Sequence, residues 1–353
     1  MKIVFTILSL GFGGAERVVS VLANELIKEH DVTIVLTYKE PVQAYKLDER
    51  ISVVPINTTG KIVPTWKAFR KFCKKEKPDA VIAFMTDTGI LSAIALAGTG
   101  IPVFTSERND PNVKAMQPSK KLQLLNKFAP FFTAGYVFQS EGARAFFPKK
   151  IQKKSCIILN PLNADKLPER DEQAVDNRIV SVGRLTEQKN QKMLINAFAR
   201  STAAENHTLH IYGDGNLREA LATQIAALGM EGKIILEGNS AHVHEDIKNA
   251  KLFAFTSDYE GLPNALMEAM AIGLPCISTD CSPGGARMLI EDGENGILIP
   301  CGDEERLTKE FNDLLPDVDR LKDLGEQAKN IRNKTSISTI AQCWLDFVSQ
   351  SIK

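Results

Sequence analysis

Two glutamates eight positions apart, Glu260 and Glu268, are the residues whose chemistry is easiest to interpret. Glu260 lies in a short loop after an apolar run, and Glu268 lies in a helix expected over residues 263–272. Pro263 suits the first turn of that helix, because the N–H that proline lacks would have no partner there. The free N–H groups of residues 261–265 and the positive helix end favour an anion, and both carboxylates could accept hydrogen bonds from sugar hydroxyls. The alternative is that both glutamates are charges favoured by the helix dipole.

Two cations follow another apolar run. Arg184 ends the strand expected over residues 178–184, and Lys189 lies five residues later, where a helix should begin. Such a pair can neutralise a diphosphate leaving group, the arginine through bidentate bonds and the lysine as a point charge. Stabilising that leaving group is the main chemical demand of sugar transfer from a nucleotide donor, because negative charge develops there. A solvated basic loop is the alternative interpretation.

A glycine-rich loop joins the first expected strand to its helix. Gly13 and Gly14 allow the backbone to approach a ligand and to direct amides toward phosphate. A dinucleotide-binding fingerprint would need a third glycine where the chain has Glu16. No acidic residue ends the next apolar run, residues 31–37, which continues into Tyr38, so the loop does not indicate NAD.

Two short patterns resemble metal sites in composition alone. His242 and His244 are separated by one residue, but further Cys or carboxylate ligands at a metal-binding spacing are missing from the sequence around them. Asp317 and Asp319 form an Asp-x-Asp pattern inside a charged helical tail rather than at the end of a strand. We therefore expect no metal in the chemistry of this chain.

The elements that must position these residues follow a regular alternation. Apolar runs alternate with helical patterns along 353 residues, which predicts α/β domains with parallel sheets and crossover helices. The expected strands are 2–8, 31–37, 79–84, 102–107, 133–140 and 155–161, then 178–184, 209–215, 233–238, 252–257, 275–279 and 296–300. The expected helices include 15–29, 66–77, 187–200, 216–229, 263–272 and 336–351.

This alternation predicts two Rossmann-like, doubly wound domains that face each other across a cleft, with ligands at the carboxyl ends of the strands. We expect the first domain over residues 1–160 and the second over 161–335. Residues 336–353 would form a last helix that could pack back onto the first domain. Six scattered cysteines without a CxxC pair indicate reduced thiols in a cytosolic protein. The first strand is too short an apolar run to be expected as a signal peptide or a membrane span.

Charge is divided unequally between the two halves. Residues 1–155 carry 23 Lys or Arg and 13 Asp or Glu, whereas the remaining residues carry 20 and 30. A basic first domain suggests an anionic partner. Nucleic acid is not expected, because no binding motif or pattern of stacking aromatics accompanies the charge. Residues 66–77 and 146–154 are candidate basic faces for a membrane surface or a lipid diphosphate, and a solvated helix with a buried aromatic stripe is the alternative.

Together these segments resemble glycosyltransferase family 4 over nearly the whole chain. The matching segments are GGAER (13–17), VGRL followed by KN (182–190), GDG (213–215), EGLPNALMEAMAIGLP (260–275) and DGENGILIP (292–300). The resemblance implies a retaining transferase of GT-B fold that binds its sugar nucleotide mainly through the second domain. It implies no cofactor beyond that co-substrate.

The resemblance also implies roles for single residues. Glu260 would contact the donor sugar, Glu268 the ribose hydroxyls, and Arg184 and Lys189 the diphosphate. The catalytic set would be Glu260, Arg184 and Lys189. The substrate-binding residues would be Gly13, Gly14, Arg108, Gly261, Leu262, Pro263, Asn264 and Glu268. Residues 237–243 would hold the nucleobase, largely through their backbone.

The chain departs from the family pattern at two positions. Arg108 stands where many members have a histidine, so we expect it to stabilise charge rather than to act as a base. Arg287 stands near a position that is often acidic in the family, so that contact is not transferred to this chain. Retention without an obvious protein nucleophile suggests front-face displacement, in which the departing phosphate oxygen accepts the proton of the acceptor.

Within the family, the chain is similar to enzymes that extend lipid-linked oligosaccharides for bacterial O-antigen, capsule or N-linked glycan assembly, including GalNAc transferases. This similarity implies a hexosyltransferase that acts on a polyprenyl-diphosphate-linked acceptor at the cytoplasmic face of the membrane. UDP-linked GalNAc, GlcNAc, Gal and Glc are all admissible donors. A UDP-sugar epimerase of the same fold and a non-catalytic nucleotide-sugar-binding protein remain as alternatives.

Overall fold

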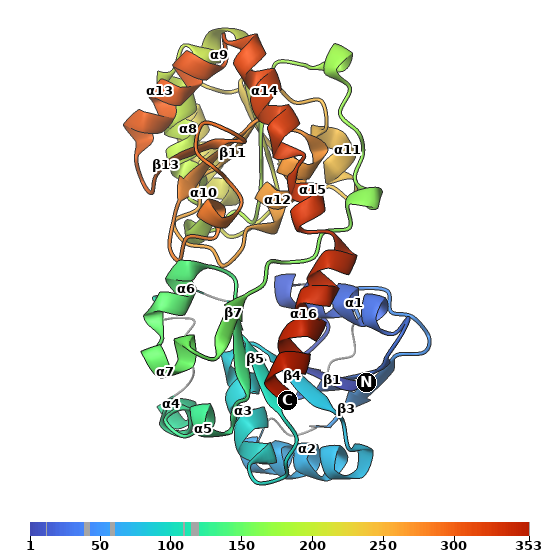
Figure 1. Cartoon of the computed structure of the whole chain (residues 1–353). Helices are drawn as coiled ribbons and strands as arrows, with labels where there is room; N and C mark the ends of the chain where they lie inside the picture. The colour runs from blue at the N-terminus through green and yellow to red at the C-terminus, as the bar shows by residue number, and fades with distance from the viewer. Residues whose placement is uncertain (12, 39–42, 57–60, 109, 114–119, 353) are drawn as a thin grey trace. The chain divides into compact units, whose positions relative to one another are not determined.

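The computed structural model describes residues 1–352 except 12, 39–42, 57–60, 109 and 114–119 (Figure 1). The chain divides into two compact units: Met1–Pro161 with Thr335–Lys353, and Leu162–Lys334. Within the described residues, the first unit contains a seven-stranded sheet and the second a six-stranded sheet, and neighbouring strands in both pair in parallel. The predicted class, two α/β domains built on parallel sheets, is confirmed.

The sheet of the first unit has the order β3-β2-β1-β4-β5-β6-β7. Its strands are β1 (Lys2–Ile7), β2 (Asp31–Leu36), β3 (Ser52–Pro55), β4 (Ala80–Phe84), β5 (Val103–Ser106), β6 (Gly135–Phe138) and β7 (Ser155–Ile157). The inner strands are buried apolar runs, as expected for a parallel sheet covered on both faces. Sequence reasoning missed β3, because this edge strand is short and only partly buried, and so it lacks a continuous apolar run.

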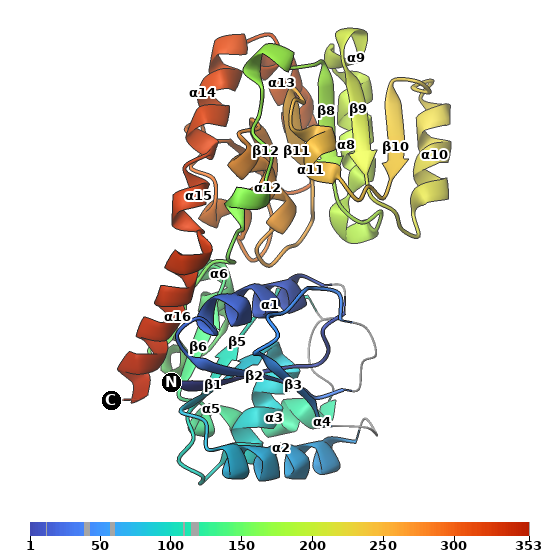
Figure 2. The ribbon, with the colours of Figure 1, turned by 90° about the vertical axis from the view of Figure 1, so that its right-hand side faces the viewer.

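Helices surround this sheet, and the last helix of the chain packs with them. The helices are α1 (Gly14–Leu26), α2 (Ile62–Glu76), α3 (Thr86–Leu96), α4 (Lys120–Asn126), α5 (Ala129–Phe132), α6 (Glu141–Phe146), α7 (Lys149–Gln152) and α16 (Ile337–Ile352). Helix α16 runs beside α1 (Figures 1 and 2). Its buried Trp344 stacks on Phe84 of β4, with ring centroids 5.8 Å apart. The C-terminal residues therefore complete the core of the first unit.

The sheet of the second unit has the order β10-β9-β8-β11-β12-β13. Its strands are β8 (Arg178–Val182), β9 (Thr208–Tyr212), β10 (Ile234–Gly238), β11 (Leu252–Phe255), β12 (Cys276–Asp280) and β13 (Ile297–Pro300). Its helices are α8 (Gln191–Arg200), α9 (Ala203–Asn206), α10 (Arg218–Ala227), α11 (Val243–Ile247), α12 (Asn264–Ile272), α13 (Glu304–Leu314), α14 (Val318–Ala328) and α15 (Ile331–Lys334). Strand order reverses at β8, which lies between β9 and β11 (Figure 2). Ligands of open α/β sheets bind outside the carboxyl ends of the strands at such a point.

Two helix starts differ from the sequence-based expectation. The helix predicted from residue 187 is instead a 3-10 turn, Glu187–Lys189, followed by α8. Asn190, with φ of 45°, separates the two, and its side chain accepts a hydrogen bond from the backbone N–H of Met193. Pro263 caps α12 and lies one residue before its first turn.

The Asp-x-Asp pattern lies at the start of a helix. Asp317 caps α14 and accepts a hydrogen bond from the backbone N–H of Arg320 at 3.0 Å.

Candidate donor-binding site

The loops after β8 and β11 meet at the point where the strand order reverses. Lys189, in the turn after β8, forms a salt bridge through Nζ with Oε1 of Glu260, in the loop after β11. The same oxygen accepts from the Ser257 hydroxyl at 3.1 Å and from the Gln188 amide at 3.3 Å. Gln188 also donates to the Tyr259 carbonyl at 2.9 Å. Two residues predicted to share a site are therefore joined by hydrogen bonds between their two loops.

The Lys189–Glu260 pair is largely shielded from water. The two side chains are 15% and 12% exposed. The Lys189 ammonium also lies 4.7 Å from the centroid of the Phe255 ring, where the ring quadrupole attracts a cation. A cation held at this depth acts more strongly on a nearby anion than one in open solvent, because the local dielectric is lower. The pair can therefore hold a phosphate oxygen at Lys189 and a sugar hydroxyl at Glu260.

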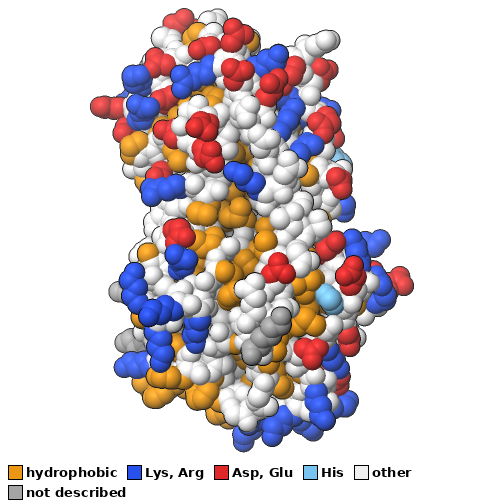
Figure 3. Space-filling view, in the orientation of Figure 1, with side chains coloured by type: hydrophobic (Ala, Val, Ile, Leu, Met, Phe, Trp, Pro, Cys, Tyr) orange, Lys and Arg blue, Asp and Glu red, His pale blue; other side chains and the backbone are white. Residues whose placement is uncertain are grey.

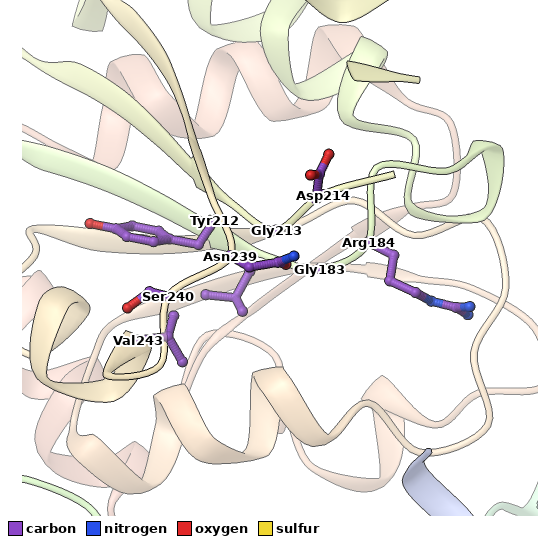
Figure 4. Close-up of a pocket in the computed structure, with 9 residues that line it drawn as sticks. Gly183, Arg184, Tyr212, Gly213, Asp214, Asn239, Ser240 and Val243 are labelled. Atoms are coloured by element: carbon purple, nitrogen blue, oxygen red, sulfur yellow. The ribbon is translucent and has the colours of Figure 1, made fainter. Parts of the chain in front are cut away.

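A pocket of about 180 Å³ opens at the carboxyl ends of β8 and β9 (Figure 4). Arg184 lies on one side of the pocket, and Tyr212 and Ser240 lie on the other (Figure 4). A Cβ atom on Gly213, which has φ of 131°, would lie 2.1 Å from the Gly183 carbonyl oxygen. Glycine is therefore required at this position, which explains one residue of the GDG segment.

The segment predicted to hold the nucleobase contributes the rest of this pocket. Asn239, Ser240 and Val243, which follow β10, line it. The Ser240 hydroxyl accepts from the backbone N–H of His242 at 3.0 Å and donates to Asp246, which fixes the loop. Sequence reasoning did not single out Tyr212, the last residue of β9, and it named Asn239 only as part of residues 237–243.

Glu268 lies in α12 and is mostly buried. Its Oε2 is 3.0 Å from Nε2 of His244 in α11. His244 was considered in the sequence only as a possible metal ligand. Among the residues that the structure describes, there is no group of three or more His, Cys, Asp or Glu side chains that could hold a metal ion. His244 is instead a partner of a predicted ribose-binding carboxylate.

The loop before α12 is held by close backbone packing. A Cβ atom on Gly285 would lie 1.8 Å from the Gly261 carbonyl oxygen, so the two backbones are in direct contact. Leu262 is buried, and the Pro263 carbonyl accepts from the Met267 N–H at 3.1 Å. Asn264 is the first residue of α12. The four predicted binding residues of this loop, 261–264, are therefore held in place at the N-terminus of α12.

In the first unit, Gly13 and Gly14 stand at the start of α1, and Phe12 lies outside the described residues. The Gly13 carbonyl accepts from the Tyr45 hydroxyl at 3.1 Å. Arg108, predicted to bind substrate, is buried within this unit. Its guanidinium carbon lies 4.8 Å from the centroid of the Phe84 ring and 5.8 Å from that of Trp344.

Polar partners also surround the Arg108 guanidinium. Its Nε donates to the Ser106 hydroxyl and one terminal nitrogen donates to Asn160, both at 2.6 Å. Burial lowers the pKa of Arg108 to about 9. These contacts lie under the C-terminal helix, so Arg108 helps to hold α16 on the sheet of the first unit.

Two family descriptions match consecutive parts of the sequence. Residues 12–165 match Glycosyltransferase Family 4, and residues 165–331 match Glycosyl transferases group 1. The chain is 31% identical to the GalNAc-alpha-(1->4)-GalNAc-alpha-(1->3)-diNAcBac-PP-undecaprenol alpha-1,4-N-acetyl-D-galactosaminyltransferase of Campylobacter jejuni, over 99% of both chains. It is 39% identical to a lipopolysaccharide 1,6-galactosyltransferase of Salmonella typhimurium, over 41% of this chain and 42% of that one.

Solved structures resemble the chain in fold. Anabaena HepE in complex with UDP has a TM-score of 0.84 at 20% identity, covering 99% of this chain and 100% of that chain. The lipopolysaccharide outer core galactosyltransferase WaaB has a TM-score of 0.81 at 21% identity, covering 99% of each. Among the described residues, no helix has both the length and the apolar character that crossing a bilayer requires.

Proposed function

The chain belongs to glycosyltransferase family 4, and from this premise we propose that it is a retaining enzyme that transfers a hexose or N-acetylhexosamine from a UDP-linked donor. Glycosyltransferase activity itself follows from the family. The observation that carries the proposed site is the contact between Lys189 and Glu260 where the strand order of the second unit reverses. That position is adjacent in sequence and fold to the pocket beside Arg184.

The pocket supports a nucleotide as the donor group. Its walls at the carboxyl ends of β9 and β10, which include Tyr212, Asn239 and Ser240, would take the base. Arg184 and Lys189 would take the two phosphates, because both follow β8 and carry positive charge. Anabaena HepE, which is similar in fold, was solved in complex with UDP, and on that similarity we propose UDP rather than GDP. Glu268, beside His244, would accept hydrogen bonds from the ribose.

The proposed reaction exchanges one bond at the anomeric carbon for another. The bond from that carbon to the β-phosphate oxygen breaks, and an acceptor hydroxyl oxygen bonds to the same face of the sugar. The hydroxyl proton passes to the departing phosphate oxygen, so that UDP leaves with the charge that Arg184 and Lys189 stabilise. Glu260 would hold the sugar by a hydroxyl during this exchange. The proposal requires neither a metal nor a cofactor.

For the acceptor, we propose a lipid-linked oligosaccharide, because the name of a relative that matches the whole chain specifies an undecaprenol-diphosphate glycan. The first unit supports an anionic, membrane-bound partner. On α2, Phe69 and Cys73 are buried while Lys67, Lys71 and Lys74 are exposed, so basic side chains line the solvent side of this helix. We therefore propose a peripheral position on the cytoplasmic face of the membrane.

Donor binding and product formation test this function separately. The full-length chain is heated with a panel of UDP- and GDP-sugars, and a matching donor should raise its unfolding temperature. The same donor is then incubated with lipid-linked acceptors, and the product is analysed for anomeric configuration. Failure of every nucleotide sugar to raise the unfolding temperature or to be consumed would overturn the proposal. Conversion of the donor at C2 without transfer would identify the epimerase alternative.

A further inference from the structure

The first unit exposes several large apolar side chains within one short part of the chain. Leu124, Phe128, Phe131, Phe132 and Phe146, here called the aromatic patch, are between 45% and 67% exposed. They come from α4 to α6, a short part of the chain. Scattered single apolar side chains are normal on a protein surface, whereas several together indicate an interaction site.

The elements that carry the aromatic patch are held together by specific contacts. The Lys150 ammonium of α7 lies 4.2 Å from the centroid of the Phe131 ring of α5. Lys154 donates to the carbonyl oxygens of Pro130 and Thr133 at 2.5 Å each. Phe146 packs edge-on against Phe147, with ring centroids 5.6 Å apart, and Phe147 is partly buried and packs against the cluster that includes Phe138. The exposed rings are therefore presented by a fixed framework.

The part of the sequence that carries the aromatic patch is rich in positive charge. Residues 111–161 contain nine Lys or Arg and one Asp or Glu, a net charge of +8. The single acidic residue, Glu141, pairs with Arg144 at 2.9 Å. Among the described residues of this stretch, Lys127, Lys149, Lys150 and Lys153 are exposed, and the Lys150 ammonium contacts the Phe131 ring. Figure 3 shows hydrophobic and basic side chains next to each other over α4, α5 and α7, at the lower left of the view.

We propose that the aromatic patch inserts into the headgroup region of an anionic bilayer, with the surrounding lysines bound to the lipid phosphates. Aromatic side chains suit the boundary between headgroups and acyl chains, and each nearby lysine is attracted by anionic lipid. Lysine is depleted at protein–protein interfaces, so a lipid surface accounts for the combination better than a protein does. Single-stranded nucleic acid also pairs cations with stacking rings, and the experiment below distinguishes that partner.

This surface differs in kind from the basic face of α2. In α2, Phe69 and Cys73 are buried and Trp66 and Phe72 are partly buried, so its rings are less exposed than those of the aromatic patch. The aromatic patch has both exposed rings and lysines. Its purpose, delivery of the enzyme to a lipid-linked acceptor, rests on the proposed function, whereas its binding to lipid does not.

Vesicle binding by the full-length chain tests the inference. Phe131→Ser with Phe132→Ser should weaken partition onto phosphatidylcholine vesicles containing phosphatidylglycerol by about tenfold or more, because both rings would leave the boundary region. Val318→Ser, at an exposed apolar position on α14 of the second unit, is the matched control and should bind like the wild type. Lys149→Glu with Lys150→Glu should remove the preference for anionic over zwitterionic vesicles.

A second measurement distinguishes loss of lipid binding from misfolding of the variants. Phe131→Trp should shift its fluorescence to shorter wavelength with anionic vesicles, and acrylamide should quench it less. Equal partition of the double serine variant and the wild type, or an unshifted Phe131→Trp spectrum, would overturn the inference. The inference would also be overturned if poly-dT displaced the wild type from vesicles and the lysine variants lost poly-dT binding as much as vesicle binding. That result would assign the patch to nucleic acid. Thermal protection by a UDP-sugar reports on the proposed function independently, because the patch variants should retain it.

Discussion

Lys189 and Glu260 each satisfy the other's charge where the donor diphosphate and sugar should lie. A phosphate group can replace Glu260 as the partner of Lys189, and a sugar hydroxyl can replace Lys189 as the partner of Glu260. The contact thus holds both side chains in position before the donor binds. Preorganised charge of this kind needs no rearrangement when the leaving group develops its negative charge.

Replacing Lys189 by alanine should lower kcat/KM by about 10²–10³-fold, because a charge directed at the leaving group is lost and Glu260 is left without its cation. Lys189→Arg should recover part of the rate, since it restores charge with a different geometry. Initial rates with the best donor of the panel measure both variants. Lys192→Ala, on α8, is a control that removes a neighbouring lysine. Equal rates for Lys189→Ala and Lys192→Ala would contradict the assigned role.

Glu107 predicts a pH dependence of stability that is separate from the donor site. Its carboxyl is buried after β5, and burial raises its pKa to about 7, with Asp87 adding to the increase and the Thr86 hydrogen bond opposing it. Between the ordinary carboxyl pKa and about 7, the folded chain retains a proton that the unfolded chain has released. Stability from this group is therefore complete at low pH and is lost as pH rises, by at most about 3 kcal/mol.

The variant Glu107→Gln should remove this pH dependence, because glutamine does not titrate. Urea unfolding midpoints of both proteins at about pH 5 and about pH 8 measure it, and the wild type should lose more stability than the variant over this interval. Glu294→Gln, at an exposed position of the second unit, controls for loss of a carboxylate. A wild type and a Glu107→Gln variant with parallel pH profiles would show that Glu107 is ionised in the folded chain.

At the residue scale, the sequence predicted which positions share a site but not how they pair. Glu260 and Lys189 could be assigned to one site because both follow apolar runs of a parallel sheet. The contact of His244 with Glu268 could not, since it depends on where α11 lies relative to α12. Arg108 was predicted to bind substrate, and its contact with Trp344, from the far end of the chain, was not predicted, because sequence spacing does not reveal it.

At the element scale, the sheets were largely predictable because buried parallel strands are nearly continuous apolar runs. Twelve expected strands correspond to β1, β2 and β4 to β13, with ends that differ by at most four residues. The turn before α8 was predicted as helix, because the left-handed conformation of Asn190 that interrupts it leaves no clear trace in the hydrophobic pattern. Because α8 begins only at Gln191, Lys189 lies in the turn before it, where its side chain reaches Glu260.

The close approach of β8 and β9 gives a prediction at this scale. Gly213→Ala should distort the pocket, because its Cβ would lie 2.1 Å from the Gly183 carbonyl. We expect a loss of about 1–3 kcal/mol in stability and at least a tenfold weaker affinity for UDP. Gly229→Ala is the control, since it also has a positive φ but its Cβ would meet nothing within 4 Å. Calorimetric titration with UDP measures both, and equal affinities would contradict the steric explanation.

At the scale of the whole molecule, the chain crosses between its units twice. Residues 162–334 form one continuous unit, whereas the first unit needs its last helix from the end of the chain. Charge follows the same division, with the basic residues concentrated in the unit that carries α2 and the aromatic patch. Composition predicted this asymmetry directly. The anchoring of α16 could only be suggested, because an amphipathic terminal helix does not identify the surface that it covers.

The final prediction concerns that anchoring. Trp344 is almost fully buried, stacks on Phe84 and lies beside Arg108. Trp344→Ala should therefore destabilise the first unit by about 3–5 kcal/mol through lost contacts and the cavity left behind. The second unit contains none of these residues, so a UDP-sugar should still raise the temperature of its own unfolding transition. Hydrogen exchange followed by mass spectrometry separates the two units, with Val318→Ala as a control on the exposed surface of α14. Faster exchange in both units would contradict the prediction, because it would mean that α16 stabilises the chain as a single cooperative body.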